Sequence, residues 1–257
     1  QSRDDYARLA MANMYDGISS AMKNDFGPAL QSFQLAWQIG IETDDKDLQV
    51  HALTNMAGVY KYAGKPSSAE EKLIKAIELL EDTEWQQTLA NNLLALAIIQ
   101  EENKKIEAAK LSVTKAMDIF EKEQNISMYL SCVEQLGGLL ERSGNLNDAL
   151  KVYRFAINGR TRFEESGLLV SLHRNIGSIH LKQREYDLAK DHLELSLHLS
   201  DSLQNYLEQD STLVKLIHVS ATMGEVEKTN YYTQRLVRFH RMQEEKHVEE
   251  TLASLET

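Results

Sequence analysis

The sequence is poor in the residues that mark disulfide-rich, β-sheet and membrane proteins. Cys132 is its one cysteine, so no internal disulfide can form. Pro28 and Pro66 are its two prolines, and no Pro/Gly-rich linker and no strand-like alternation occurs along the 257 residues. No apolar run is long enough for a membrane span within this chain. These absences favour an all-α protein.

Motifs that carry chemistry are also missing. The chain has no HExxH, phosphate-binding glycine loop, GxSxG or dinucleotide motif. Its eight histidines do not show metal-ligand spacing. His173 and His180 share a helix face, but their slots match Val133 and Leu140 forty residues earlier, so we expect buried or half-buried core histidines. His192 lies on the following helix with no paired carboxylate motif. The sequence therefore predicts no enzyme, no catalytic residue, no metal site and no cofactor.

The charge is acidic. Lys and Arg number 28 against 39 Asp and Glu, a formal net charge of −11. Nucleic-acid binding needs a concentrated basic face, so no nucleic acid is expected as a partner. The simplest explanation of the excess of acidic residues is a solvated surface. The more specific hypothesis is a preference for basic partners.

What the sequence does contain is a repeat of 40 residues. A small residue recurs at that interval, and a second small residue follows it seven positions later. The first set is Ala29, Ala69, Ala109, Ala149 and Ala189, with Thr229 in the sixth slot; the second is Ala36, Ala76, Ala116, Ala156 and Ser196. Small residues let paired helices approach closely, and stacked pairs bury a continuous core that no single pair could form.

A turn signal separates the two helices of each repeat. Gly64, Gly144 and Gly224 stand where a first helix should end, and Asn24 matches them. Glycine and asparagine adopt the left-handed conformation of a helix terminus at little cost. Lys104 and Arg184 hold the slot in the other two repeats, where the expectation of this turn is weaker.

These repeats resemble tetratricopeptide repeats (TPRs), in a subclass with longer helices and a 40-residue period. The resemblance implies a right-handed α-solenoid of about six antiparallel helix pairs over residues 1–240, with residues 241–257 extending a long C-terminal helix. The expected pairs after a first unit at 5–41 are 47–63 with 66–80, 84–102 with 106–122, 126–143 with 146–159, and 165–183 with 186–202. A sixth unit starts near Tyr206, turns at Gly224 and enters the long helix.

In TPR proteins the first helix of each pair lines a concave wall that holds a protein or peptide ligand. Applied to this sequence, that rule predicts a concave wall that is apolar in its first repeats, acidic in the middle and more basic towards its C-terminal end. The projected residues are Met14, Ile18, Thr54, Gly58, Lys61, Tyr62, Leu94, Ile98, Glu101, Glu134, Gly138, Glu141, Arg174, Ser178 and His218. The slots at which co-chaperone TPR domains carry a lysine and asparagine clamp hold Met14, Thr54 and Leu94 here, so that subtype is excluded.

Two functional hypotheses follow. The charged C-terminal helix resembles the helices that follow sensory TPR segments in bacterial signalling proteins, which implies a regulatory module that binds a peptide or protein partner. The alternative is a structural scaffold that self-associates through its terminal helices, for example as a homodimer through the C-terminal helix. The chain begins at Gln1 and not at Met, so a removed signal peptide would place it in the periplasm and a trimmed start would leave it in the cytoplasm.

Overall fold

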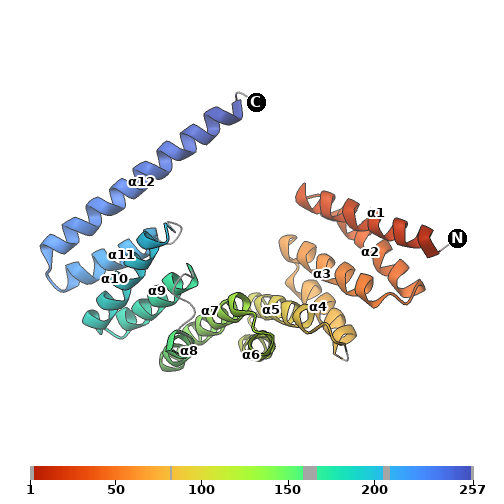
Figure 1. The fold of residues 1–257 in the computed structure, drawn as a ribbon, viewed down its shortest axis with the longest axis horizontal. Helices are drawn as coiled ribbons and strands as arrows, with labels where there is room; N and C mark the ends of the chain where they lie inside the picture. The colour runs from red at the N-terminus through yellow and green to blue at the C-terminus, as the bar shows by residue number, and fades with distance from the viewer. Residues whose placement is uncertain (1–2, 82, 159–166, 205–208, 256–257) are drawn as a thin grey trace. The chain divides into compact units, whose positions relative to one another are not determined.

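The computed structural model describes residues 3–81, 83–158, 167–204 and 209–255, and every regular element in these ranges is an α-helix (Figure 1). The predicted all-α class is confirmed, and the helix bounds agree closely with those expected from the 40-residue period. The helices are α1 (Arg3–Met22), α2 (Phe26–Glu42), α3 (Lys46–Tyr62), α4 (Pro66–Leu80), α5 (Gln86–Glu102), α6 (Ile106–Lys122), α7 (Ile126–Arg142), α8 (Leu146–Asn158), α9 (Gly167–Lys182), α10 (Tyr186–Ser202), α11 (Gln209–Thr222) and α12 (Val226–Leu255).

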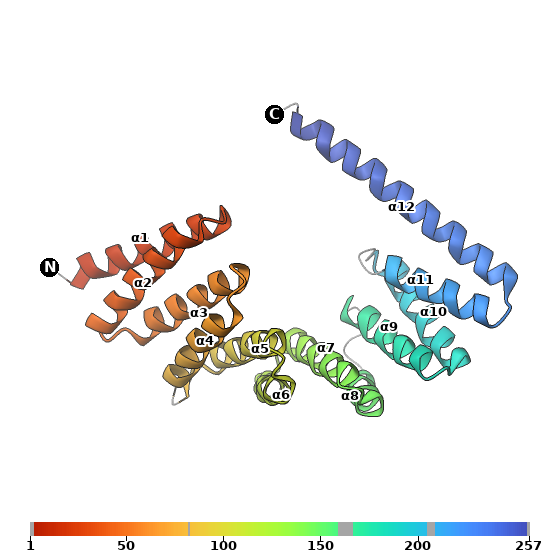
Figure 2. The same cartoon turned by 180° about the vertical axis from the view of Figure 1, so that it is seen from behind.

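The chain divides into two compact units, residues 1–139 (unit 1) and residues 140–257 (unit 2). Unit 1 contains α1 to α6 and most of α7, and unit 2 contains the end of α7 and α8 to α12. In unit 1, α1, α3 and α5 are the first helices of successive repeats, and each packs on the second helix that follows it (Figures 1 and 2). The helix α3 also packs on α2, and α5 on α4, so each repeat shares its core with its neighbour.

The alanines of the repeat are at the helix contacts, as the spacing predicts. All five, from Ala29 to Ala189, are completely buried. Gly17 in unit 1 and Gly177 in unit 2 allow a close approach between the helices of their pairs. A Cβ atom on Gly17 would lie 2.6 Å from the Phe33 ring, and one on Gly177 would lie 2.7 Å from Leu193 Cγ. The small residues therefore set how near the two helices of a pair can come.

The turn between the helices of a pair has the same conformation in all six repeats. The residues in that slot have φ values from 61° at Asn24 to 81° at Gly144, and Lys104 and Arg184 are among them. At Lys104 the following N–H, of Lys105, donates to the carbonyl of Gln100 over 2.8 Å, which is the Schellman bond that closes a helix. The repeat therefore imposes the left-handed turn even on residues that have no preference for it.

An aspartate directly precedes both α2 and α3, and the two behave differently. The Asp25 side chain makes no capping hydrogen bond to α2. The Asp45 carboxylate caps α3, because it accepts from the backbone N–H of Leu48 over 3.0 Å.

Unit 2 ends in the longest helix of the described chain. Tyr232 and Leu236 of α12 pack against the core that Leu193, Leu213 and Leu216 form. From Arg241 to Glu249 every residue of α12 is exposed, so this half of the helix is solvated.

Candidate functional site

Two hollows lie end to end along α1 and α3 in unit 1. The first, of about 730 Å³, borders the N-terminal half of α1 and the turn into α3. Its lining residues are Tyr6, Ala7, Ala10, Met11, Met14 and Tyr15 of α1, Ile39, Thr43, Asp44, Asp45, Lys46, Asp47, Leu48 and His51 around the turn, and Trp85. The second, of about 420 Å³, borders the C-terminal half of both helices. Its lining residues are Ile18, Ala21, Met22, Asn24, Phe26, Phe33, Thr54, Asn55, Gly58, Val59 and Tyr62.

We call this pair of hollows the α1–α3 trough. From Tyr6 to Met22 it follows 16 residue steps of α1, which is about 24 Å of helix. Four apolar side chains, Met11, Tyr15, Ile18 and Met22, line it at spacings of four, three and four residues. That spacing puts them on one side of α1. All four are exposed, Met22 to 81%.

The wall formed by α3 contains a glycine without a packing role. Gly58 lies inside α3, and a Cβ atom added there would meet nothing within 4 Å. Glycine in a helix interior costs about 1 kcal/mol relative to alanine. Tyr62, one turn further along, is 79% exposed. The trough is therefore wider at this point than the packing of the protein requires.

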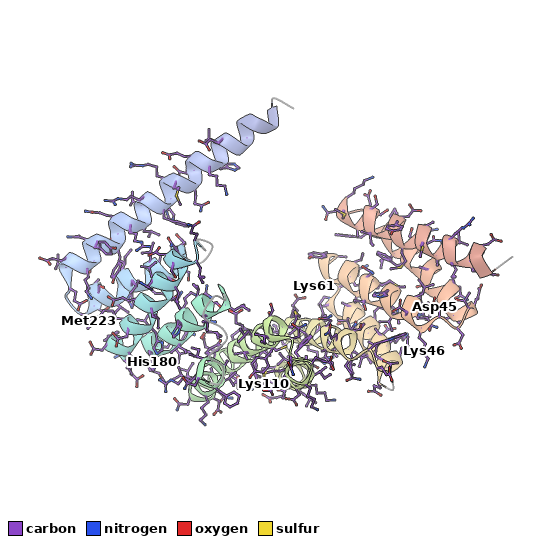
Figure 3. All side chains as sticks on the ribbon, viewed as in Figure 1. Asp45, Lys46, Lys61, Lys110, His180 and Met223 are labelled. Carbon is purple, nitrogen blue, oxygen red and sulfur yellow. The ribbon has the colours of Figure 1, made fainter. Side chains whose placement is uncertain are left out.

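The trough differs in charge between its ends. Asp44, Asp45 and Asp47 surround its first end, at the N-terminus of α3, together with Lys46. Asp47 pairs with His51 over 3.4 Å, and Asp45 is engaged in the helix cap. At the other end of α3 lies Lys61, which is labelled in Figure 3. It pairs with Glu102 of α5 over 3.6 Å. The aspartates leave the first end acidic.

None of the fifteen residues projected from the repeat is buried. Met14, Ile18, Thr54, Gly58 and Tyr62 line the trough, and Met14 also packs against the core around Phe33. The charged residues of the middle and the far end are engaged with neighbours. Gln135 donates to Glu101 over 2.7 Å, Lys182 to Glu141 over 2.8 Å, and Arg174 to Asn175 over 3.1 Å. Leu94, Ile98, Glu134, Gly138, Ser178 and His218 are half-buried or exposed on their first helices. A binding role for all fifteen stays a prediction.

Sequence reasoning missed several residues of the trough. Met11, Tyr15, Met22 and Trp85 were not projected, because the projection used only the two or three slots per helix that face a ligand in TPR proteins. The signal was present in the spacing of the apolar residues from Met11 to Met22. The same spacing would also fit a row of side chains that faces the core, so only the structure shows that these side chains are exposed.

The described residues offer little for catalysis. They contain no group of three or more His, Cys, Asp or Glu side chains that could hold a metal ion. Burial raises the pKa of the Cys132 thiol to about 12, so it is not a nucleophile at neutral pH. Among these residues, no helix is both long and apolar enough to cross a bilayer.

Known structures share the fold. BtubC (BKLC) from P. vanneervenii is 15% identical with a TM-score of 0.70, over 95% of this chain and 93% of that one. PilF of Pseudomonas aeruginosa is 16% identical with a TM-score of 0.63, over 94% and 99%. Aspartyl phosphate phosphatase F from Bacillus subtilis is 16% identical with a TM-score of 0.67, over 93% and 72%. No curated protein matches the sequence.

These likenesses confirm the TPR-like fold that the repeat predicts. At the level of the sequence, the family described as Soluble NSF attachment protein, SNAP, matches residues 19–253, which is most of the chain. The chain therefore belongs to the soluble NSF attachment protein family, and its fold is a TPR-like helical repeat.

Proposed function

We propose that unit 1 binds an amphipathic helix of a protein partner in the α1–α3 trough. The observation that carries the proposal is the row of exposed apolar side chains along α1, from Met11 to Met22, beside open hollows. Contiguous exposed apolar surface of this kind marks interaction sites in soluble proteins. Methionine side chains are flexible and polarisable, which suits a surface that adapts to a partner.

The shape of the trough fits a helix. Its walls are two neighbouring helices, and a third helix packs on such a pair by placing its ridge of side chains in the groove between them. The 24 Å of the trough corresponds to about 16 residues of an α-helix at 1.5 Å per residue. Recognition of this type uses apolar anchors at i, i+3 or i+4, and i+7 of the bound helix.

The charge of the trough indicates the chemistry of the partner. Asp44, Asp45 and Asp47 surround one end, and the whole chain has a net charge of −11. Charge complementarity favours a partner with basic residues at the end that faces these aspartates. The partner is therefore an amphipathic helix with an apolar stripe and a basic end. The family name, which describes an attachment protein, supports a role in holding another protein.

The test uses a displayed library of helical peptides of about 18 residues, long enough to fill the trough at 1.5 Å per residue. The apolar stripe is fixed at i, i+4, i+7 and i+11, and the other positions are random. The proposal predicts that selected peptides carry basic residues near one end and bind with affinities measurable by fluorescence anisotropy. Met22→Glu and Tyr62→Glu should each weaken binding at least tenfold, because a charge would be buried in an apolar contact.

The matched control is Leu111→Glu, which places the same charge on an exposed apolar position of α6 that does not line the trough. This variant should bind the peptides as the unchanged protein does. Selected peptides whose affinity is the same for all three variants, or a selection that enriches no peptide, would overturn the proposal.

For the finer role we propose that the chain is the sensory or regulatory part of a signalling protein, with α12 as its output. Its support is the exposed, charged half of α12 and a fold shared with aspartyl phosphate phosphatase F. Hydrogen exchange of α12 tests it. A selected peptide bound in unit 1 should change the protection of residues 226–249, and unchanged protection would favour the scaffold alternative, in which the terminal helices mediate self-association.

A further inference from the structure

Three histidine rings stack inside unit 2. The ring centroids of His173 and His192 are 5.2 Å apart, and those of His192 and His180 are 5.8 Å apart. His173 and His180 lie on α9 and are buried, as their slots in the repeat predict, and His192 comes from α10. The contact between His192 and the other two was not expected from the sequence.

The partners of His180 indicate which of its ring nitrogens accepts a hydrogen bond. A guanidinium nitrogen of Arg154, on α8, lies 3.1 Å from His180 Nε2, and Glu185 lies 2.5 Å from His180 Nδ1. An arginine can only donate, so Nε2 must offer its lone pair. The proton of neutral His180 is then on Nδ1 and is donated to the Glu185 carboxylate. This is a neutral imidazole between a cation and an anion.

The other two rings share one proton. The Nδ1 atoms of His173 and His192 are 3.0 Å apart, so one of them donates and the other accepts. Burial, followed by the charge of His192, lowers the pKa of His173 to about 4. Burial, His180 and Arg154 lower the pKa of His192, against a smaller opposite effect of Asp191. Both rings therefore resist a second proton.

The contact with Arg154 is a polar link between residues 140–158 and α9 with its turn. Lys182 with Glu141 over 2.8 Å and Gln183 with Asn147 over 3.0 Å also link these segments. In the contact of His180 the acceptor is an imidazole nitrogen, and an imidazole that takes up a second proton can no longer accept a hydrogen bond. The junction between the fourth and fifth repeats is thus held in part by a titratable group.

We propose that Arg154, His180 and Glu185, with His192 and His173 stacked beside them, form an acid-operated clamp between α8 and α9. At neutral pH, His180 accepts from Arg154 and donates to Glu185, and α8 is held on α9. A proton on Nε2 of His180 removes the acceptor and places a second cation against the guanidinium. Protonated His180 keeps its bond to Glu185 in a charge-assisted form. The Arg154 side chain, which is exposed to solvent, then moves away from His180, and the contact between α8 and α9 weakens.

The first test is the tautomer of His180, read by long-range ¹H–¹⁵N correlation of the histidine side chains. At pH 7.5 the proposal requires the Nδ1–H form at His180. The exposed His218 and His247 serve as internal references in the same spectrum. An Nε2–H form at His180 would overturn the clamp, because that form cannot accept from Arg154.

The second test is hydrogen exchange between pH 7.5 and pH 5.5, corrected for the intrinsic pH dependence of exchange. Protection of α8, residues 146–158, should fall at least fivefold more than protection of α6, residues 106–122, in the same sample. Arg154→Met should have low α8 protection at both pH values. His180→Asn, which can accept and donate without titrating, should keep a constant level across the range. Equal pH dependence of α8 in the unchanged protein and in both variants would contradict the proposal.

Discussion

Unit 1 and unit 2 repeat the same 40-residue pattern with different interiors. The cores of unit 1 are clusters of apolar residues, such as Leu73 with Leu96 and Ile99. Unit 1 also buries the polar residues Glu70, Asn92, Gln100 and Ser112. Unit 2 has an apolar cluster around Leu193 and buries more polar residues, two of them histidines: Ser171, His173, His180, Ser196, Ser200, Gln209, Thr212 and Ser220. The period sets where helices pack, because the alanine slots are identical in both units. It leaves open whether the remaining slots are filled by apolar or by polar side chains.

The polar links between repeats differ in the same way. In unit 1 the buried Glu70 accepts from Asn103 over 2.6 Å and from Lys105 over 2.9 Å, which ties α4 to the turn after α5. Neither donor loses its function near neutral pH. In unit 2 the links between α8 and α9 include the contact of Arg154 with His180. Unit 1 thus combines a buried carboxylate link with an exposed apolar trough, while unit 2 carries buried histidines in its interior.

The largest expected effect comes from truncating a matched pair of leucines. Leu73 and Leu193 occupy the same slot three repeats apart, and both are buried. Replacing either by alanine should cost about 3 kcal/mol, from lost apolar contact and the cavity left behind. Both tryptophans, Trp37 and Trp85, lie in unit 1, so tryptophan fluorescence during urea unfolding reports that unit alone.

Leu73→Ala should therefore shift the fluorescence transition. Leu193→Ala should shift the transition seen by circular dichroism and leave the fluorescence midpoint in place. If both variants shift both signals equally, the two units unfold together in one cooperative transition. The two units would then not differ in their free energies of unfolding.

The next effect is the acid sensitivity of unit 2. The pKa of His173 is lowered from 6.5 to about 4 in the folded state, so the unfolded chain binds more protons below pH 6.5. Stability is therefore unaffected above pH 6.5 and is lost as the pH falls towards 4, by about 2 kcal/mol at pH 5. His173→Asn should remove that part of the pH dependence.

The control for this prediction is His51→Asn, at an exposed position in unit 1. Urea midpoints measured by circular dichroism at pH 7.5 and pH 5 give the comparison. Should the two asparagine variants lose stability on acidification to the same extent, the buried His173 is not the source of the effect.

A smaller effect should follow from relieving the backbone strain of two left-handed turn residues. Lys104 and Arg184 hold the same slot in the two units, with φ of 62° and 61°. Glycine accepts this conformation without the clash that a Cβ atom creates, so Lys104→Gly and Arg184→Gly should each stabilise by about 1 kcal/mol. Lys104→Gly should raise the fluorescence midpoint, and Arg184→Gly should not. A loss of stability in either would mean that the side chain itself supports the turn.

The smallest effect concerns two buried serines. The Ser220 hydroxyl, in unit 2, is buried without a hydrogen-bond partner among the described residues, whereas Ser112 Oγ, in unit 1, donates to Gln100 over 2.8 Å. Removing an unsatisfied polar group should be neutral or stabilising by up to about 1 kcal/mol. Removing one of two bonded partners should cost about 1 kcal/mol. Ser220→Ala and Ser112→Ala should thus differ in sign by urea unfolding, and equal destabilisation would show that Ser220 is satisfied in solution.

Much of the fold could be predicted because small residues recur at the same positions of each repeat. The alanines from Ala29 to Ala189 and the glycines of the turns gave the helix pairs and most of their bounds. The turns at Lys104 and Arg184 were harder, because their side chains carry no preference for a left-handed φ. An aspartate before a helix does not by itself establish a cap, since Asp45 caps α3 and Asp25 makes no capping hydrogen bond to α2.

The site was predictable only in part. The projected Ile18, Thr54 and Gly58 line the trough, but Met11 and Tyr15 have a helical spacing that fits a buried stripe equally well. Packing between helices decides which row of apolar side chains faces a neighbouring helix. The sequence of a single helix does not contain that information. The stack of His192 on His173 has the same origin, since it depends on the register of α10 against α9.

The most direct test of the trough as a binding site is Gly58→Leu. Nothing lies within 4 Å of the added Cβ, so the side chain starts in open space. Replacing a glycine inside a helix by leucine should stabilise by up to about 1 kcal/mol. The account predicts that the fluorescence midpoint of unit 1 rises while affinity for the selected helical peptides falls at least tenfold. A more stable protein that binds those peptides with unchanged affinity would contradict it.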